Sequence, residues 1–187
     1  MFVLLLLVGA GMASVPGGDD SVAQVRRFYD DHAGVVLLSQ VVELVATLPL
    51  VLFLRGLAAS SLVRVRRATA PVGVALVVAS LLTLVPPLLL VLLHERGTAG
   101  QVRVLAELSD LTDVVLFATI TGFAIVWGSA GLDPGWLRWL ALVVGVAAGL
   151  RAVEITLGGH LLEVLAPVGF IVLVVAFSTL LLRPRGT

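Results

Sequence analysis

Five apolar runs of about 20 residues each divide the chain, and short polar segments separate them. A helix of this length crosses the hydrocarbon core of a bilayer, which is about 30 Å thick. The five runs cover residues 35–54, 71–93, 111–130, 136–157 and 161–182. They predict an all-α, polytopic transmembrane helical bundle that forms a single domain over residues 1–187.

The composition excludes several other classes of protein. With 59% hydrophobic and 13% charged residues, the chain is too apolar for a soluble domain with a charged surface. It has no cysteine, which removes disulfides, thiolate ligands and thiol nucleophiles. Its formal net charge of zero predicts no nucleic-acid partner. The absence of lysine beside abundant alanine, valine, leucine and arginine indicates a GC-rich bacterial genome.

A further apolar run at 2–15 brings the expected number of spans to about six. A helix of about 14 residues rises only about 21 Å, which is short for a full span. The run is either a short or truncated transmembrane helix or the apolar region of a signal peptide. Because Met1 and Phe2 supply no basic segment before it, we favour the helix.

The segments between the runs are expected to lie outside the membrane. Residues 14–34 contain turn chemistry (PGGDD) followed by a partly amphipathic stretch, and residues 94–109 are a polar connection. Pro49 predicts a kink near the end of its run, and Pro86 with Pro87 predicts a break in the last third of the 71–93 run.

Arginines set the expected orientation, because they are retained on the cytoplasmic side of short loops. With six spans, one side carries seven loop or tail arginines, and the other carries four together with most of the acidic residues. Both termini are therefore expected in the cytoplasm, and the protein in the cell inner (plasma) membrane. Trp127, Trp136 and Trp139 fall near the cytoplasmic ends of their runs, where an aromatic belt is expected.

Charged and polar side chains inside the runs are the candidates for function, because burying them in lipid is costly. Gln40, Glu43 and Thr47 follow helical spacing and predict one polar stripe, with Glu43 about 13 Å into its span. Arg151 and Glu154 are three residues apart and are expected to form an ion pair on one helix face. If so, Arg151→Ala alone should destabilise more than the double alanine variant, because it strands a carboxylate.

These residues also have structural interpretations. Asp110 and Asp113 open the fourth run, where acids cap a helix amino terminus. In the structural interpretation, Arg151 and Glu154 serve only to lock helix packing. Gly145 and Gly149 form a GxxxG pattern that favours close packing with another helix, including a membrane partner or a second copy. The functional alternative is an outward-facing polar pocket formed by Gln40, Glu43, Asp110, Asp113, Arg151, Glu154 and His160. No metal or cofactor is expected, since no HxxxH or ExxH spacing places two ligands on one helix.

The carboxyl-terminal half resembles a known family. The stretch DPGWLRWLALVVGVAAGL, followed by a short outer loop, a span containing Ala166-Pro167 and a basic tail, is similar to an uncharacterised bacterial family of small six-helix membrane proteins. This family is abundant in actinobacteria and is catalogued as a domain of unknown function. The resemblance implies an architecture over nearly the whole chain and no activity. The short first run departs from the family pattern.

Two functions follow from the sequence, and it does not decide whether the protein is an enzyme. In the first, the pocket binds a lipid-like or amphipathic small molecule, or a partner helix, with Arg151 as the anchor for an anionic group. In the second, an intramembrane enzyme isomerises or cyclises a lipid or isoprenoid, with Glu43 as general acid and with Asp113 or Glu154 as base or as the group that stabilises a cation. A proton-coupled transporter is a weaker alternative, because no inverted repeat is evident.

Overall fold

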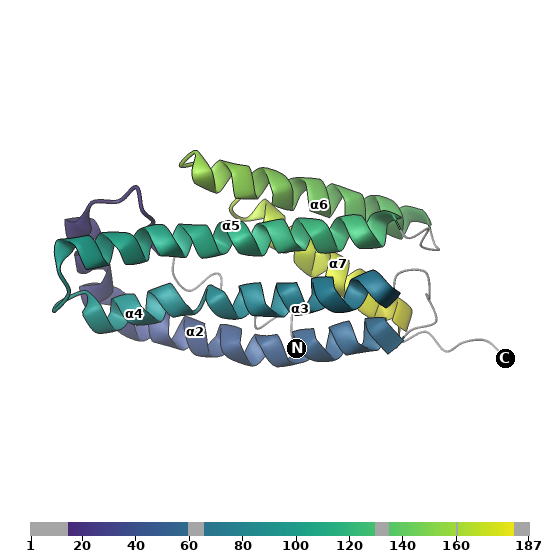
Figure 1. Ribbon diagram of the computed structural model, residues 1–187, viewed down its shortest axis with the longest axis horizontal. Coiled ribbons are helices and arrows are strands. Elements are labelled where there is room, and N and C mark those ends of the chain that lie inside the picture. Colours follow the sequence, from purple (N-terminus) through teal and green to yellow (C-terminus); the bar gives the residue numbers. More distant parts are fainter. Residues whose placement is uncertain (1–14, 60–65, 130–134, 160, 182–187) are drawn as a thin grey trace. The chain divides into compact units, whose positions relative to one another are not determined.

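The structure is a computed structural model that describes residues 15–59, 66–129, 135–159 and 161–181. The expected span at 2–15 therefore lies outside the described residues, except for its last residue, and so do both termini. The helices are α2 (Val22–Ala59), α3 (Arg66–Leu82), α4 (Val85–Leu93), α5 (Ala99–Ser129), α6 (Gly135–Thr156) and α7 (Leu165–Leu181) (Figure 1). The described part of the chain contains no strand.

Four helical segments are long and apolar enough to cross a membrane. They are Val22–Ala58, Ala70–Leu93, Ala99–Ser129 and Gly135–Thr156, and Leu165–Thr179 is a shorter apolar helix. The prediction of an all-helical, multi-pass architecture is confirmed at this level, and the apolar helices indicate a membrane-embedded protein. The count of six spans and the cytoplasmic termini stay predictions.

Two segments expected to lie between the spans, outside the membrane, are largely helical and continue the apolar helices, and their place outside the membrane stays a prediction. α2 begins at Val22, within the expected 14–34 loop, and α5 begins at Ala99, within the expected 94–109 connection. Ser21 and Gln24 bond reciprocally at the start of α2 (2.9 and 3.3 Å), and Thr98 with Gln101 does the same before α5 (2.8 and 3.3 Å). These capping boxes satisfy free amides at each helix start, so that polar residues continue the apolar helices.

The two longest helices exceed the thickness of a bilayer core. α2 has 38 residues and α5 has 31, which correspond to lengths of about 57 and 46 Å. About 30 Å suffices to cross the hydrocarbon. Each helix is therefore long enough to extend beyond the hydrocarbon core into the aqueous or headgroup region.

The prolines differ in whether they interrupt a helix. α3 ends at Leu82 and α4 begins at Val85, so the break predicted from Pro86 and Pro87 is confirmed. Both prolines lie in the first turn of α4, where the missing amide hydrogen would have no helical acceptor in any case. Pro49, by contrast, lies inside α2, which continues to Ala59.

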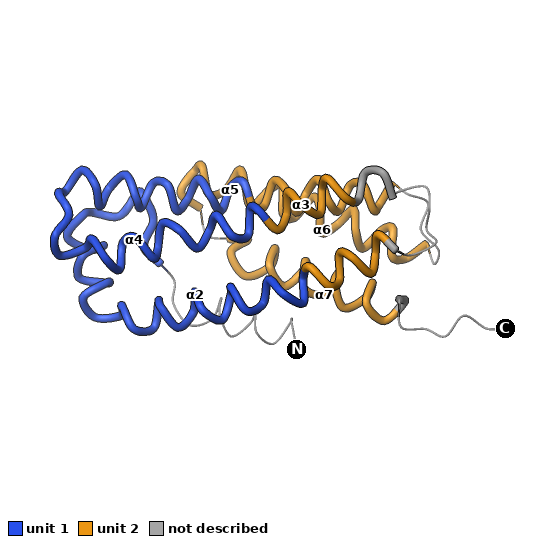
Figure 2. The backbone as a smooth tube through the Cα atoms, turned by 60° about the horizontal axis from the view of Figure 1, so that its bottom comes forward, with its two compact units in different colours: residues 1–50, 78–115 blue, residues 51–77, 116–187 orange. Residues whose placement is uncertain are grey.

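Contacts divide the chain into two compact units, coloured separately in Figure 2. Unit 1 comprises Met1–Leu50 and Val78–Val115, and unit 2 comprises Val51–Val77 and Leu116–Thr187. α2, α3 and α5 each contribute residues to both. The units are described one at a time below.

A buried cluster of unit 1 joins the first turns of α2 and α5 to the second half of α4. Its buried residues come from α2, α4 and α5: Val25, Tyr29, Val36, Leu90, Val102, Leu105 and Ala106. Burial of these side chains stabilises the helical form of segments that look like loops by composition, because amphipathic helices gain most of their stability from tertiary packing.

The core of unit 2 is aromatic. Trp127 is 1% exposed, and its ring centroid lies 6.1 Å from Phe123 and 5.2 Å from Phe177. The expectation that Trp127 belongs to an interfacial aromatic belt was therefore wrong, because its indole fills the core between helices. Trp136 and Trp139 are exposed, as belt residues would be.

Gly145 and Gly149 allow α6 to approach α5 within unit 2. A Cβ atom on Gly145 would lie 3.1 Å from the Cβ of Ala124, and one on Gly149 would lie 3.4 Å from the Thr121 hydroxyl. The Thr121 hydroxyl donates to the Gly145 carbonyl at 3.2 Å. The close packing expected of the GxxxG pattern is thus made inside the chain, and a membrane partner or homo-oligomer through these glycines stays a prediction.

Gly145→Val is expected to reduce the free energy of unfolding by about 1–3 kcal/mol, because the new side chain overpacks the α5–α6 contact. Equilibrium unfolding of the detergent-solubilised protein measures this loss. Gly122→Val is the matched control, since a Cβ on Gly122 meets nothing within 4 Å. Equal losses in the two variants would contradict the packing explanation.

Candidate functional site

The polar stripe predicted on α2 lies in unit 1 and is built mainly around Gln40. The Ser39 hydroxyl donates to the Val36 carbonyl (2.8 Å), and the Thr47 hydroxyl donates to the Glu43 carbonyl (3.1 Å). Both hydroxyls are therefore satisfied by their own helix. Gln40 is buried, with 6% of its surface exposed, and its amide nitrogen lies 3.5 Å from the Ser39 hydroxyl, at the limit of a hydrogen bond.

The amide oxygen of Gln40 is buried and has no hydrogen-bond partner among the described residues. Exchanging the amide oxygen and nitrogen would only leave the other end without a partner. A buried polar group left unsatisfied costs about 1–3 kcal/mol. One helical turn further on, Glu43 is half-buried and takes part in none of the ion pairs of the described chain. The stripe therefore presents polar atoms that the described residues do not saturate.

Asp110 connects the amino-terminal segment of unit 1 to α5. Its Oδ2 accepts a hydrogen bond of 2.7 Å from the Gly18 amide. A Cβ on Gly17 would lie 2.7 Å from Asp110 Oδ1, and one on Gly18 would lie 2.9 Å from Cγ of Glu107. Only glycines allow this close approach, and the carboxylate holds the loop against the helix.

The capping role expected of Asp110 and Asp113 at a helix amino terminus was wrong. α5 starts at Ala99, so both acids lie well inside the helix and are half-buried there. The capping is done instead by Thr98 and Gln101. Glu163 is exposed in the turn before α7.

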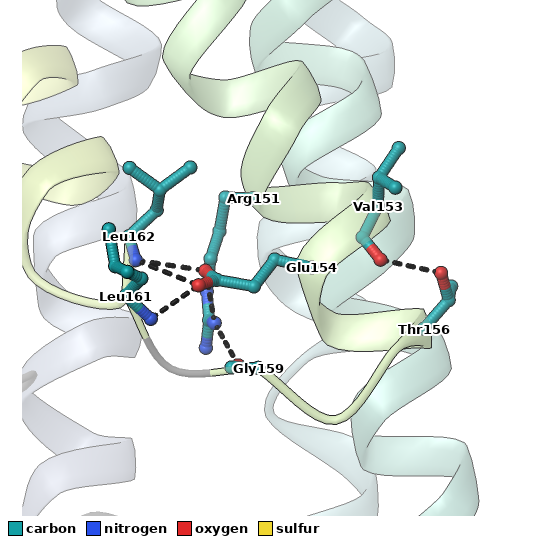
Figure 3. A network of polar contacts seen from close by, with 7 residues as sticks. All are labelled: Arg151, Val153, Glu154, Thr156, Gly159, Leu161 and Leu162. Atoms are coloured by element: carbon teal, nitrogen blue, oxygen red, sulfur yellow. Dashed lines mark hydrogen bonds and ion pairs between the residues drawn. The ribbon is translucent and has the colours of Figure 1, made fainter.

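Arg151 and Glu154 form the predicted pair in unit 2, at the end of α6 (Figure 3). Arg151 Nη1 donates to Glu154 Oε2 at 2.9 Å and to the Gly159 carbonyl at 2.8 Å. The side chains are 11% and 15% exposed. The guanidinium thus joins the last turn of α6 to the chain that follows it.

Glu154 also accepts hydrogen bonds from the backbone beyond the turn. The Leu162 amide donates to Oε1 at 3.1 Å and to Oε2 at 2.9 Å, and the Leu161 amide donates to Oε1 (Figure 3). Gly158 has a φ of 68°, a left-handed conformation that glycine adopts readily and that ends α6. The network therefore closes the α6–α7 turn. A carboxylate engaged in this way is a poor candidate for a general base.

The seven residues predicted to line one pocket are divided between the two units, apart from His160, and the shared pocket stays a prediction. Arg151 and Glu154 meet each other in unit 2, while Gln40, Glu43, Asp110 and Asp113 belong to unit 1. Gln40 and Glu43 share the α2 stripe, and Asp110 contacts the amino-terminal segment. His160 lies outside the described residues.

A second cluster in unit 1 was missed by sequence reasoning. Asp30 of α2 meets His94 and Glu95, which follow α4, and their ligating atoms all lie within 4.8 Å of one another. HxxxH and ExxH spacing places two ligands on one helix, whereas this cluster joins α2 to the turn after α4. The available signal was that both segments flank consecutive spans on the same predicted side of the membrane.

No protein-family model matches the chain, and no curated protein or solved structure shows significant similarity to it.

Proposed function

We propose that this chain is a multi-pass protein of a bacterial inner membrane that binds a lipid-like or amphipathic small molecule through the α2 stripe. The observation that carries the proposal is the buried Gln40 amide oxygen without a partner, one turn from the half-buried Glu43. Both groups accept hydrogen bonds, so the ligand would present a donor such as a hydroxyl or an amine. Its apolar part would lie in the bilayer.

The exposed faces of the helices support a membrane setting. On α6, large apolar side chains recur every three or four residues and are more than half exposed. They are Trp139, Val143, Val146, Leu150 and Val153. An apolar stripe of this size on a helix face requires lipid or a protein partner. The resemblance to actinobacterial six-helix proteins and the arginine distribution, with both termini cytoplasmic, complete this proposal.

Because Arg151 of α6 already has partners, we place the proposed ligand-binding groups on α2 instead. Arg151 Nη1 is engaged by Glu154 and Gly159, so it is a weaker anchor for an anionic ligand than the sequence implied. The Glu154 carboxylate is also engaged, by Arg151 and the Leu162 amide, so it is a weaker candidate for the base of the catalytic alternative. Arg151 keeps one buried donor without a partner, Nε, whereas the acceptors predicted for the pocket that have unused hydrogen-bonding capacity are on Gln40 and Glu43.

Native mass spectrometry of the intact protein, released from mild detergent, tests the proposal. We expect wild type to retain a discrete small molecule, and Gln40→Leu and Glu43→Leu to lose at least about 90% of it, since each removes an acceptor worth about 1.4 kcal/mol or more.

Thr119→Val is the matched control, because the Thr119 hydroxyl already donates to the Leu116 carbonyl (2.7 Å). This variant should retain the small molecule. Bulk phospholipid alone on wild type, or equal loss in all three variants, would overturn the proposal.

A further inference from the structure

The imidazole of His94 is held in one orientation by the end of α4. Its Nδ1 lies 2.8 Å from the Val91 carbonyl and 3.1 Å from the Leu90 carbonyl, and the residue is 8% exposed. Carbonyl oxygens only accept hydrogen bonds, so Nδ1 carries a hydrogen. In the neutral ring, Nε2 therefore carries the lone pair.

The lone pair of Nε2 points to a carboxylate. Asp30 Oδ1 lies 3.3 Å from Nε2, and both atoms are acceptors when the ring is neutral. Two facing acceptors repel each other unless a cation lies between them. The cation is either a proton, which makes an ion pair, or a metal ion.

Glu95 distinguishes this cluster from a simple pair. It supplies a third ligating atom, and the three atoms lie within 4.8 Å of one another. Ligands about 2.0–2.2 Å from one ion are at most about 4.4 Å apart. Because Asp30 and Glu95 are exposed, small side-chain rotations bring their oxygens to this spacing.

The surrounding structure holds these elements in place. Arg26 of α2 donates to the Gly97 carbonyl at 2.6 Å, which ties α2 to the turn that carries His94 and Glu95. The buried Tyr29 ring lies 6.1 Å from the His94 ring. A hydrogen bond from Nδ1 to a backbone carbonyl is also the usual support of a histidine that binds metal through Nε2.

We propose that Asp30, His94 and Glu95 bind one divalent transition-metal ion, with Zn²⁺ as the first candidate. One imidazole nitrogen and two carboxylate oxygens are ligands suited to such ions. Three protein ligands leave a coordination position for water or another ligand. This proposal is independent of the ligand proposed for the α2 stripe.

Isothermal titration of Zn²⁺ into the full chain, purified without a histidine tag and stripped with a chelator, tests the site. We expect one Zn²⁺ per chain in wild type. Asp30→Asn and Glu95→Gln should each weaken binding by about tenfold or more, because loss of a direct ligand exceeds the loss of a supporting contact. Both residues are exposed, so these variants are expected to fold.

Asp31→Asn is the matched control, since Asp31 is an exposed neighbour outside the cluster. It should bind Zn²⁺ like wild type, and His94→Gln should lose binding. The proposal is overturned if wild type binds no stoichiometric Zn²⁺, if Asp31→Asn weakens binding as much as Asp30→Asn, or if Mg²⁺ competes equally with Zn²⁺.

Discussion

Trp127→Ala is expected to lower the free energy of unfolding by about 3–5 kcal/mol, as for other large aromatic side chains removed from a core. Trp127 is 1% exposed, and its ring packs against those of Phe123 and Phe177. The ring centroids of Phe123 and Phe170 lie 6.3 Å apart. The substitution leaves a cavity between α5 and α7 that the surrounding rings fill only in part. Equilibrium unfolding in detergent micelles gives the value.

Trp139→Ala is the control for this experiment. Trp139 is 69% exposed on α6, so its removal opens no cavity, and we expect a change within about 0.5 kcal/mol. Similar losses for the two tryptophans would mean that Trp127 is not a core residue. The sequence alone placed both tryptophans in one interfacial belt.

Glu154→Ala is expected to lower the unfolding temperature by about 5–10 °C. The change removes the acceptor of the Leu161 and Leu162 amides and the counter-charge of Arg151 together. Thermal unfolding followed by circular dichroism measures the shift. Glu154→Gln should lower the unfolding temperature by less, because the glutamine side-chain oxygen still accepts hydrogen bonds from the backbone amides.

Arg151→Ala is expected to lower the unfolding temperature by less than Glu154→Ala does. After loss of the guanidinium, the Glu154 carboxylate still accepts from two backbone amides, so it is not stranded. The double alanine variant should accordingly be no more stable than Glu154→Ala. If Arg151→Ala were worse than the double variant, the interpretation from sequence alone would hold. Arg103→Ala, in the exposed Arg103–Glu107 pair, should change little.

The parts of the fold that could be predicted from the sequence are those set by local chemistry. Long apolar runs became helices, Pro86 and Pro87 separated α3 from α4, and Arg151 met Glu154 because three residues bring side chains to one helix face. The helical form of the polar segments was not predicted, since it depends on burial of Tyr29 and its neighbours between elements distant in sequence.

The candidate sites show the same limit. Helical spacing predicted the stripe of Gln40 and Glu43, but not that the Gln40 amide would be buried without a partner. Likewise, the meeting of Asp30 with His94 depends on how α2 packs on α4, which no local pattern encodes. Contacts between elements decide which polar groups are satisfied and which remain available.

The Arg151–Glu154 pair bears on how the chain enters the membrane. Each charge alone would oppose insertion of α6, by up to about 2.5–3.5 kcal/mol for a charge at the helix centre and by less near the helix end. Because both side chains belong to one helix, they can neutralise each other as soon as that helix forms, before α7 has been synthesised. α6 can therefore leave the translocation machinery as a nearly neutral segment, and the amides of Leu161 and Leu162 complete the network once the turn to α7 follows.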